Sequence, residues 1–128
     1  MAHPHEDLVH QGYSAFAAGD LDAIFVLLAD DIVYRVPGRN PLSGTYRGHH
    51  GVLEFFTRIG ERSGGTVRVE VLDVAANDTY AYVQIHESAS RDGHSYDHYG
   101  VHVLTFAGKV VEFWATPRDR YSVDEFSA

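Results

Sequence analysis

The chain has 128 residues, 45% of them hydrophobic and 22% charged, with a formal net charge of -8. This is a suitable length for one domain, and the acidic balance without a Lys/Arg cluster argues against nucleic acid as a partner. There is no cysteine, no apolar run near the ~18 residues of a membrane span and no secretory signal pattern. We therefore expect a single cytoplasmic domain over residues 1–128, without disulfides, thiolate chemistry or membrane contact.

Two helices are expected at the start of the chain. Apolar residues at helical spacing predict a helix over about 5–18. Gly19 ends it, because glycine accepts the left-handed conformation of a helix stop. Asp20 is then a natural N-cap for a second helix, whose apolar stripe reaches Leu28 and which closes at 30–31.

A short strand and a third helix follow. The β-branched residues of 32–36 predict a strand that ends at Pro37, and the glycines of 38–48 are typical of a loop. A further set of apolar residues at helical spacing predicts a helix that stops at Gly64: Val52, Phe55, Phe56 and Ile59.

From about residue 66 onward the period changes from helical to extended, which predicts four strands at 66–76, 79–90, 94–106 and 109–116. Short turns join neighbouring strands, so we expect an antiparallel meander, with a last helical turn over 118–128. Helices first and a long sheet second indicate the α+β class. Three helices over a curled sheet leave room for a cavity between them.

Five segments together resemble one family of proteins. They read AAGDLDAI at 17–24, LADDIV at 28–33, YRGHHGV at 46–52, RDG at 91–93 and GKVVEFW at 108–114. Their order and spacing resemble the nuclear transport factor 2-like superfamily, in particular its branch of SnoaL-like polyketide cyclases and ketosteroid isomerases. The resemblance implies a cone-shaped α+β barrel, in which three N-terminal helices pack on a curved antiparallel sheet and enclose a pocket. It also implies a homodimer formed through the outer sheet face, but it leaves the reaction open, because the superfamily holds many activities.

The resemblance also assigns positions to functional groups. The isomerases' carboxylate base, at the end of the strand after helix 2, falls at Val36, which cannot take a proton. A second acidic position, which donates to an oxyanion in the isomerases and is the base in the cyclases, falls at His102. The tyrosine of the first helix falls at Gly12 or Tyr13, and that of the third helix at Phe56.

The residues themselves make His102 the first candidate for chemistry. Strand alternation puts it on one face with Leu104, and its unperturbed pKa of roughly 6.5 suits acid–base work at neutral pH. Tyr34 and Tyr13 are hydrogen-bond donors for a carbonyl or an oxyanion. For each of the three, the alternative is a core side chain whose polar atom finds one partner.

A second set of residues would suit a planar, largely apolar ligand, with core packing as the alternative for about half of its aromatic members: Phe16, Leu28, Val36, Phe56, His98, Phe113 and Trp114. By strand parity Phe113 and Trp114 cannot both face inward. Glu87 has the parity of a rim residue and Asp97 lies opposite His102, although a solvated edge acid is the simpler interpretation of both.

Nine histidines raise a metal hypothesis that their spacing does not support. His98 and His102 are four residues apart on one strand, about 13 Å, which is too far for one ion. No HExxH, GxSxG, P-loop or GxGxxG motif occurs. We therefore expect no metal and no cofactor.

Two functions remain open. The first is a cofactor-independent pocket enzyme that moves protons on a largely hydrophobic small molecule, by isomerisation, cyclisation or dehydration, with His102 as acid or base and Tyr34 or Tyr13 polarising an oxygen. The second is a non-catalytic small-molecule binder or dimeric scaffold, which the valine at position 36 favours. Epoxide hydrolysis in this fold needs an Asp-Arg-Asp arrangement that the aligned strands do not supply.

Overall fold

The two ends of the first helix follow directly from the sequence. A computed structural model describes residues 3–117, and α1 (Pro4–Ala18) begins there with a capping box made by His3 and Glu6. Gly19, with φ of 70°, ends the helix as predicted, and the Asp20 side chain caps α2 (Leu21–Leu27).

The second helix is shorter than the spacing predicted. It ends at Leu27, and β1 (Leu28–Val36) follows at once, so Leu28 and the two aspartates at 30–31 belong to a strand. Leu28 pairs with Val110, a strand residue far along the chain, and both side chains are buried. This tertiary contact outweighs the local helical pattern.

A second correction concerns the segment that was expected to be a loop. Its last residues form the short strand β2 (Gly44–Arg47), which pairs with β1. The third helix, α3 (Gly48–Ser63), then runs to Gly64, where the backbone turns left-handed with φ of 64°, as predicted.

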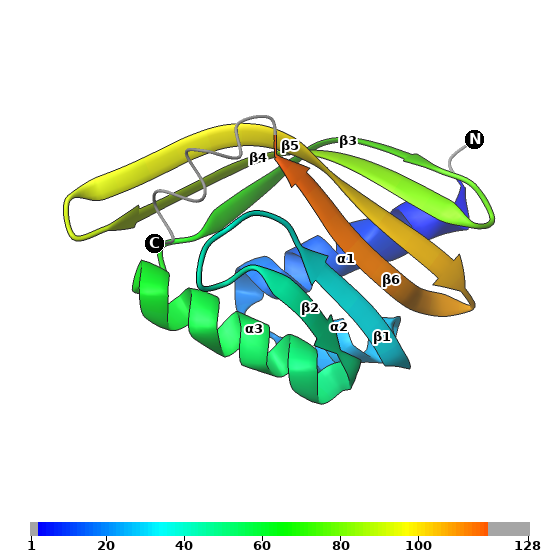
Figure 1. Ribbon diagram of the computed structural model, residues 1–128. Helices are drawn as coiled ribbons and strands as arrows, with labels where there is room; N and C mark the ends of the chain where they lie inside the picture. Colours follow the sequence, from blue (N-terminus) through cyan, green and yellow to red (C-terminus); the bar gives the residue numbers. More distant parts are fainter. Residues whose placement is uncertain (1–2, 118–128) are drawn as a thin grey trace.

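Four long strands complete the sheet close to their predicted positions: β3 (Arg68–Ala76), β4 (Tyr80–Arg91), β5 (His94–Ala107) and β6 (Lys109–Pro117). The strand order is β2-β1-β6-β5-β4-β3, and all neighbours are antiparallel except β1 and β6, which are parallel. The sheet is therefore mixed rather than wholly antiparallel, and it is curved but unclosed, with β2 and β3 at its edges (Figure 1). The α+β class and the three-helix cover are confirmed.

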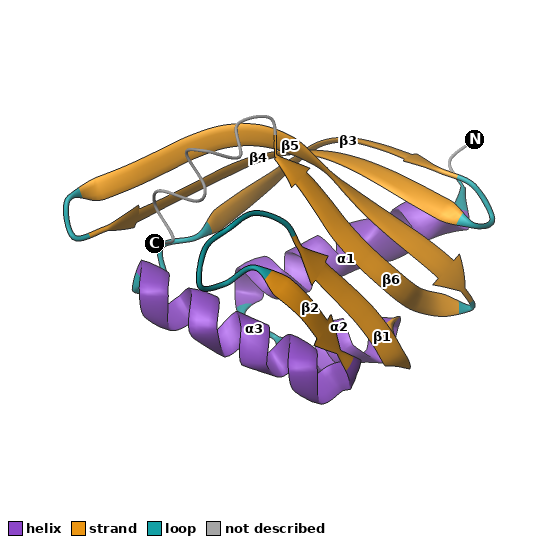
Figure 2. Cartoon of the chain, in the orientation of Figure 1, coloured by secondary structure: helices purple, strands orange, loops and turns teal. Residues whose placement is uncertain are grey.

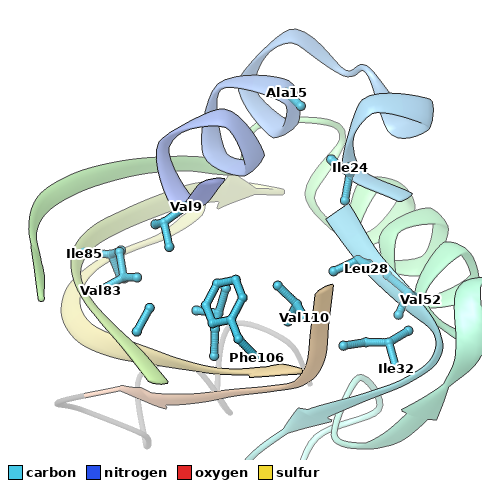
Figure 3. Close-up of a cluster of buried hydrophobic side chains, with 12 residues drawn as sticks. Val9, Ala15, Ile24, Leu28, Ile32, Val52, Val83, Ile85, Phe106 and Val110 are labelled. Atoms are coloured by element: carbon cyan, nitrogen blue, oxygen red, sulfur yellow. The ribbon is translucent and has the colours of Figure 1, made fainter. Parts of the chain in front are cut away.

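All three helices lie on the concave side of this sheet, α1 against β3 and α3 against β1 and β2 (Figure 2). Buried side chains from both layers meet in one hydrophobic cluster, as Figure 3 shows: Val9, Ala15, Ile24, Leu28, Ile32, Val52, Val83, Ile85, Phe106 and Val110. No helix of residues 3–117 is long and apolar enough to cross a membrane. The helical turn expected over 118–128 lies outside the described residues.

Candidate functional site

A cavity of about 200 Å³ lies between the helices and the concave face of the sheet. Its walls come from all three helices and from every strand except β2, and they are mostly aliphatic and aromatic. Val9, Leu28 and Phe106, from the hydrophobic cluster of Figure 3, form part of the lining. The volume is below the ~300–1,000 Å³ of sites for drug-sized molecules, so the cavity suits a smaller ligand.

The structure brings most of the sequence-predicted site residues together around this cavity: Tyr13, Phe16, Leu28, Tyr34, Val36, Phe56, His98, His102 and Phe113. The exception is Trp114. Its side chain is 37% exposed and lies on the outer sheet face, over a shallow hollow beside Arg35 and Glu112. The cause is strand alternation, because Phe113 points inward and its neighbour must point outward.

Tyr13 from α1 and His102 from β5 form the central polar pair of the cavity. The Tyr13 hydroxyl and His102 Nδ1 are hydrogen-bonded, and the two rings lie nearly parallel with their centroids 5.8 Å apart. Phe113 packs edge-on against the imidazole with a centroid distance of 4.9 Å. The imidazole is therefore held by a phenol on one side and by an aromatic wall on another.

Both members of this pair are neutral near pH 7. Burial lowers the pKa of His102 to about 4, although the charge of Glu87 opposes this effect. Burial first, and then unfavourable electrostatic interaction of a Tyr13 phenolate with Tyr34 and Glu87, raise the pKa of Tyr13 well above its ordinary value. Tyr13 has no other hydrogen-bond partner among residues 3–117, so we assign its O–H as the donor, Nδ1 as the acceptor and the imidazole hydrogen to Nε2.

Tyr34 supplies a second phenol to the cavity. Its ring stacks on Phe113 with the centroids 4.2 Å apart and also contacts Phe55 and Phe56. Burial first, and then the charge of Glu87, raise its pKa, so the hydroxyl stays protonated. Within the described part of the chain this hydroxyl has no hydrogen-bond partner, although its oxygen is not sealed from solvent. It remains available as a donor to a ligand.

A charged pair, Glu87 and His98, also faces the cavity, and the sequence interpretation of Glu87 as a solvated acid missed it. His98 Nε2 donates to Glu87 Oε1 at 2.9 Å, and the two side chains are only 7% and 18% exposed. Burial lowers the pKa of His98, but the bond to Glu87 and its charge outweigh burial and raise it overall. In an antiparallel hairpin, residues equally far from the turn lie opposite each other, and counting back from the turn at Asp92 places Glu87 opposite His98. This count could have revealed the pair from the sequence.

Other sequence-predicted placements are now clear. Val36 lines the cavity, so β1 brings no carboxylate to the expected base position. Asp97 lies on the outer face, opposite His102, and accepts from His86 Nε2 at 2.6 Å. Over residues 3–117, no three side chains of the metal-ligating types gather closely enough to hold an ion.

The chain is similar to several known proteins in sequence and in fold. A family model described as a SnoaL-like domain matches residues 9–113. An uncharacterised protein of Mycobacterium tuberculosis is 32% identical over 116 residues, 87% of this chain and 88% of that protein. The solved structure of Bal32a, from a soil-derived mobile gene cassette, has a TM-score of 0.92 at 28% identity and covers 96% of this chain and 95% of its own.

Two further structures are similar in fold alone. TerC, co-crystallised with polyporic acid, has a TM-score of 0.87 at 21% identity, covering 97% of this chain and 98% of its own. An NTF2-like protein of Burkholderia pseudomallei has the same TM-score at 23% identity, covering 96% of each chain.

Proposed function

This chain belongs to the SnoaL-like domain family of the nuclear transport factor 2-like superfamily, and on that premise we propose that it is a cofactor-independent pocket enzyme that moves a proton on a small, largely hydrophobic carbonyl compound. Isomerisation, cyclisation and dehydration next to a carbonyl share one first step. A proton leaves the carbon beside the carbonyl, and negative charge develops on the oxygen. The observation that carries the proposal is the neutral Tyr13–His102 pair inside an apolar cavity.

In this proposal the carbonyl oxygen binds between two donors. The Nε2–H of His102 and the hydroxyl of Tyr34 both suit an oxygen acceptor, and the apolar walls strengthen their effect on the developing charge. To act as the base instead, the neutral imidazole takes its other tautomer, and the carbonyl oxygen then accepts from Tyr34 and from the released Tyr13 hydroxyl. Nδ1–H then donates to the Tyr13 oxygen, while Nε2 takes the proton as the C–H electron pair forms the enolate. Return of that proton to a different carbon completes an isomerisation.

The alternative is a non-catalytic binder of the same fold. Two observations favour it: Val36 leaves β1 without a carboxylate, and a His102 pKa of about 4 makes the imidazole a weak base. TerC, the neighbour co-crystallised with polyporic acid, supports a small-molecule occupant under either function. The two functions differ in whether bound ligand exchanges a proton.

The test is hydrogen exchange at the carbon next to a carbonyl. 1-Tetralone, a small bicyclic aromatic ketone, is incubated in D₂O with the protein, and deuterium uptake is followed by NMR or mass spectrometry. We expect acceleration by the wild type and a loss on the order of 10²-fold in His102→Gln, which is typical when an acid–base group is removed. His50→Gln, on an exposed residue of α3, is the control and should leave the rate unchanged. Binding of 1-tetralone without exchange would support the binder instead.

We also propose that the chain forms a homodimer through the outer sheet face. Tyr82, Val103 and Trp114 lie side by side across β4, β5 and β6 on this face. Tyr82 and Trp114 are 45% and 37% exposed, and exposed aromatic surface of this kind is typical of interfaces. Light scattering should give twice the chain mass of 14.2 kDa, and Trp114→Ala should shift the protein toward the monomer. A wild-type monomer at all concentrations would contradict this proposal.

A further inference from the structure

The proposed function gives no role to Glu87 and His98. They lie opposite each other on β4 and β5 and both line the cavity. Structural support alone is a weak explanation for such a pair, because replacing a buried ion pair by apolar residues is often neutral or stabilising. An ionised carboxylate against apolar walls therefore points to a ligand.

The chemistry that this pair offers to the cavity is that of an acceptor. His98 directs Nε2–H at Glu87 and Nδ1–H at the carbonyl oxygen of Tyr99, at 2.9 and 3.3 Å. Both ring hydrogens are thus engaged with oxygen acceptors, and the imidazolium neutralises Glu87. The carboxylate oxygens accept only, and each carries more than one lone pair. A ligand group that binds here must donate a hydrogen bond.

Hydrogen-bond donors, rather than acceptors, face the cavity farther along the same strands. His102 pairs with Val83, four residues from the pairing of Glu87 with His98 on each strand. The backbone separation is about 13 Å, and the concave curvature of the sheet shortens the distance between side-chain tips. Tyr34 and His102 supply donors at that end, where Tyr13 orients the imidazole, and apolar walls lie in between. The cavity therefore has a donor end and an acceptor end.

We propose that Glu87, held by His98, is a binding subsite for a hydroxyl group, and that the ligand is a hydroxyl-bearing carbonyl compound whose carbonyl oxygen lies at Tyr34 and the Tyr13–His102 pair. This inference rests on the proposed function, because one ligand reaches both ends of the cavity. The carboxylate selects for the hydroxyl, since a compound without a donor at that position lacks the hydrogen bond to a charged acceptor.

Three matched probes test the subsite: 1-tetralone, 6-hydroxy-1-tetralone and 6-methoxy-1-tetralone. The hydroxyl compound donates a hydrogen bond, whereas the methoxy compound has a similar ring but cannot donate. By titration calorimetry we expect the wild type to bind the hydroxyl compound about tenfold more tightly than either of the others, as a bond to a charged acceptor predicts. Equal binding of all three, or no binding of any, would overturn the proposal.

Two variants connect the preference to Glu87. Glu87→Gln should reduce the hydroxyl preference to less than about threefold. Glu70→Gln removes the same charge near a histidine, His86, on the outer face, and should keep the preference. A preference that survives Glu87→Gln would refute the subsite. The comparison of probes on the wild type does not depend on whether a variant folds.

The outcomes also separate this inference from the proposed function. Deuterium exchange into 1-tetralone without any hydroxyl preference would leave the enzyme proposal standing and remove the subsite. A hydroxyl preference without exchange would keep the subsite and favour the binder.

Discussion

Protonation of His102 should oppose folding, and the effect is large enough to measure. Burial lowers its pKa to about 4 in the folded chain, whereas the unfolded value is about 6.5. A proton therefore binds the unfolded chain more tightly. The corresponding stability is fully present above about pH 6.5 and is lost as the pH falls toward 4. Between about pH 8 and pH 5 the expected loss is about 2 kcal/mol, and well below pH 4 it approaches about 3 kcal/mol.

The measurement is urea unfolding followed by far-UV circular dichroism, for the wild type and His102→Gln at several pH values. Glutamine keeps an acceptor for the Tyr13 hydroxyl but does not titrate. His98 and His86 have raised pKa values and change stability in the opposite direction, since they favour folding at low pH. Both remain in the variant, so their direct contributions cancel in the difference between the two proteins, and the titration of His102 dominates what is left.

We expect the wild type to lose about 2 kcal/mol relative to His102→Gln on going from pH 8 to pH 5. A difference that stays constant over this range would refute the reasoning, because His102 would then titrate as it does in water. A difference that grows in favour of the wild type at low pH would mean that the folded protein stabilises the imidazolium.

Three further predictions concern other parts of the chain. His98→Asn removes the imidazolium beside Glu87 and should cost about 2–3 kcal/mol by urea unfolding at neutral pH, and combining it with Glu87→Gln should cost less than the sum of the single changes. Gly100→Ala would place a Cβ 2.9 Å from the carbonyl oxygen of Thr116 and should cost about 1–3 kcal/mol, whereas Gly60→Ala, in open space on α3, should be neutral or stabilising. Trp114 is the only tryptophan and lies outside the cavity, so saturation with 1-tetralone should leave its emission maximum unchanged, and a shift would contradict its placement.

The parts of the fold that could be predicted are those with a local cause. Gly19 and Gly64 end helices because they adopt left-handed backbone conformations, which a sequence signals without tertiary information. Strand alternation placed His102 inward and required Phe113 and Trp114 to face opposite ways, and the structure has both. Apolar spacing predicts a helix through residues 28–31, but the structure has a strand there, because Leu28 fits either element and only its pairing with Val110 decides between them.

The parts that could not be predicted depend on distant partners. The parallel contact of β1 with β6 joins segments far apart in the chain, and no local period records it. The Glu87–His98 pair needed two facts at once, the parity of β4 and the register of the β4–β5 hairpin. Its low exposure depends on what lies over the concave face, where α1 and α3 contact β4, and strand patterns alone do not reveal such contacts. The face on which each residue lies and the count from the hairpin turn would together have predicted that Glu87 and His98 are neighbours.

The parallel pairing of β1 with β6 also affects how the protein folds. β1 forms early in the chain but receives its central neighbour only when residues 109–117 have been made. Contacts between distant segments carry a loop-closure cost, and chains that depend on them fold slowly. Tyr34 and Phe113, which stack across this boundary, come together in the same step. The aromatic wall of the cavity is therefore completed by the most distant strand pairing of the fold, and a chain stopped before β6 would hold α1, α3 and the hairpins without a binding site between them.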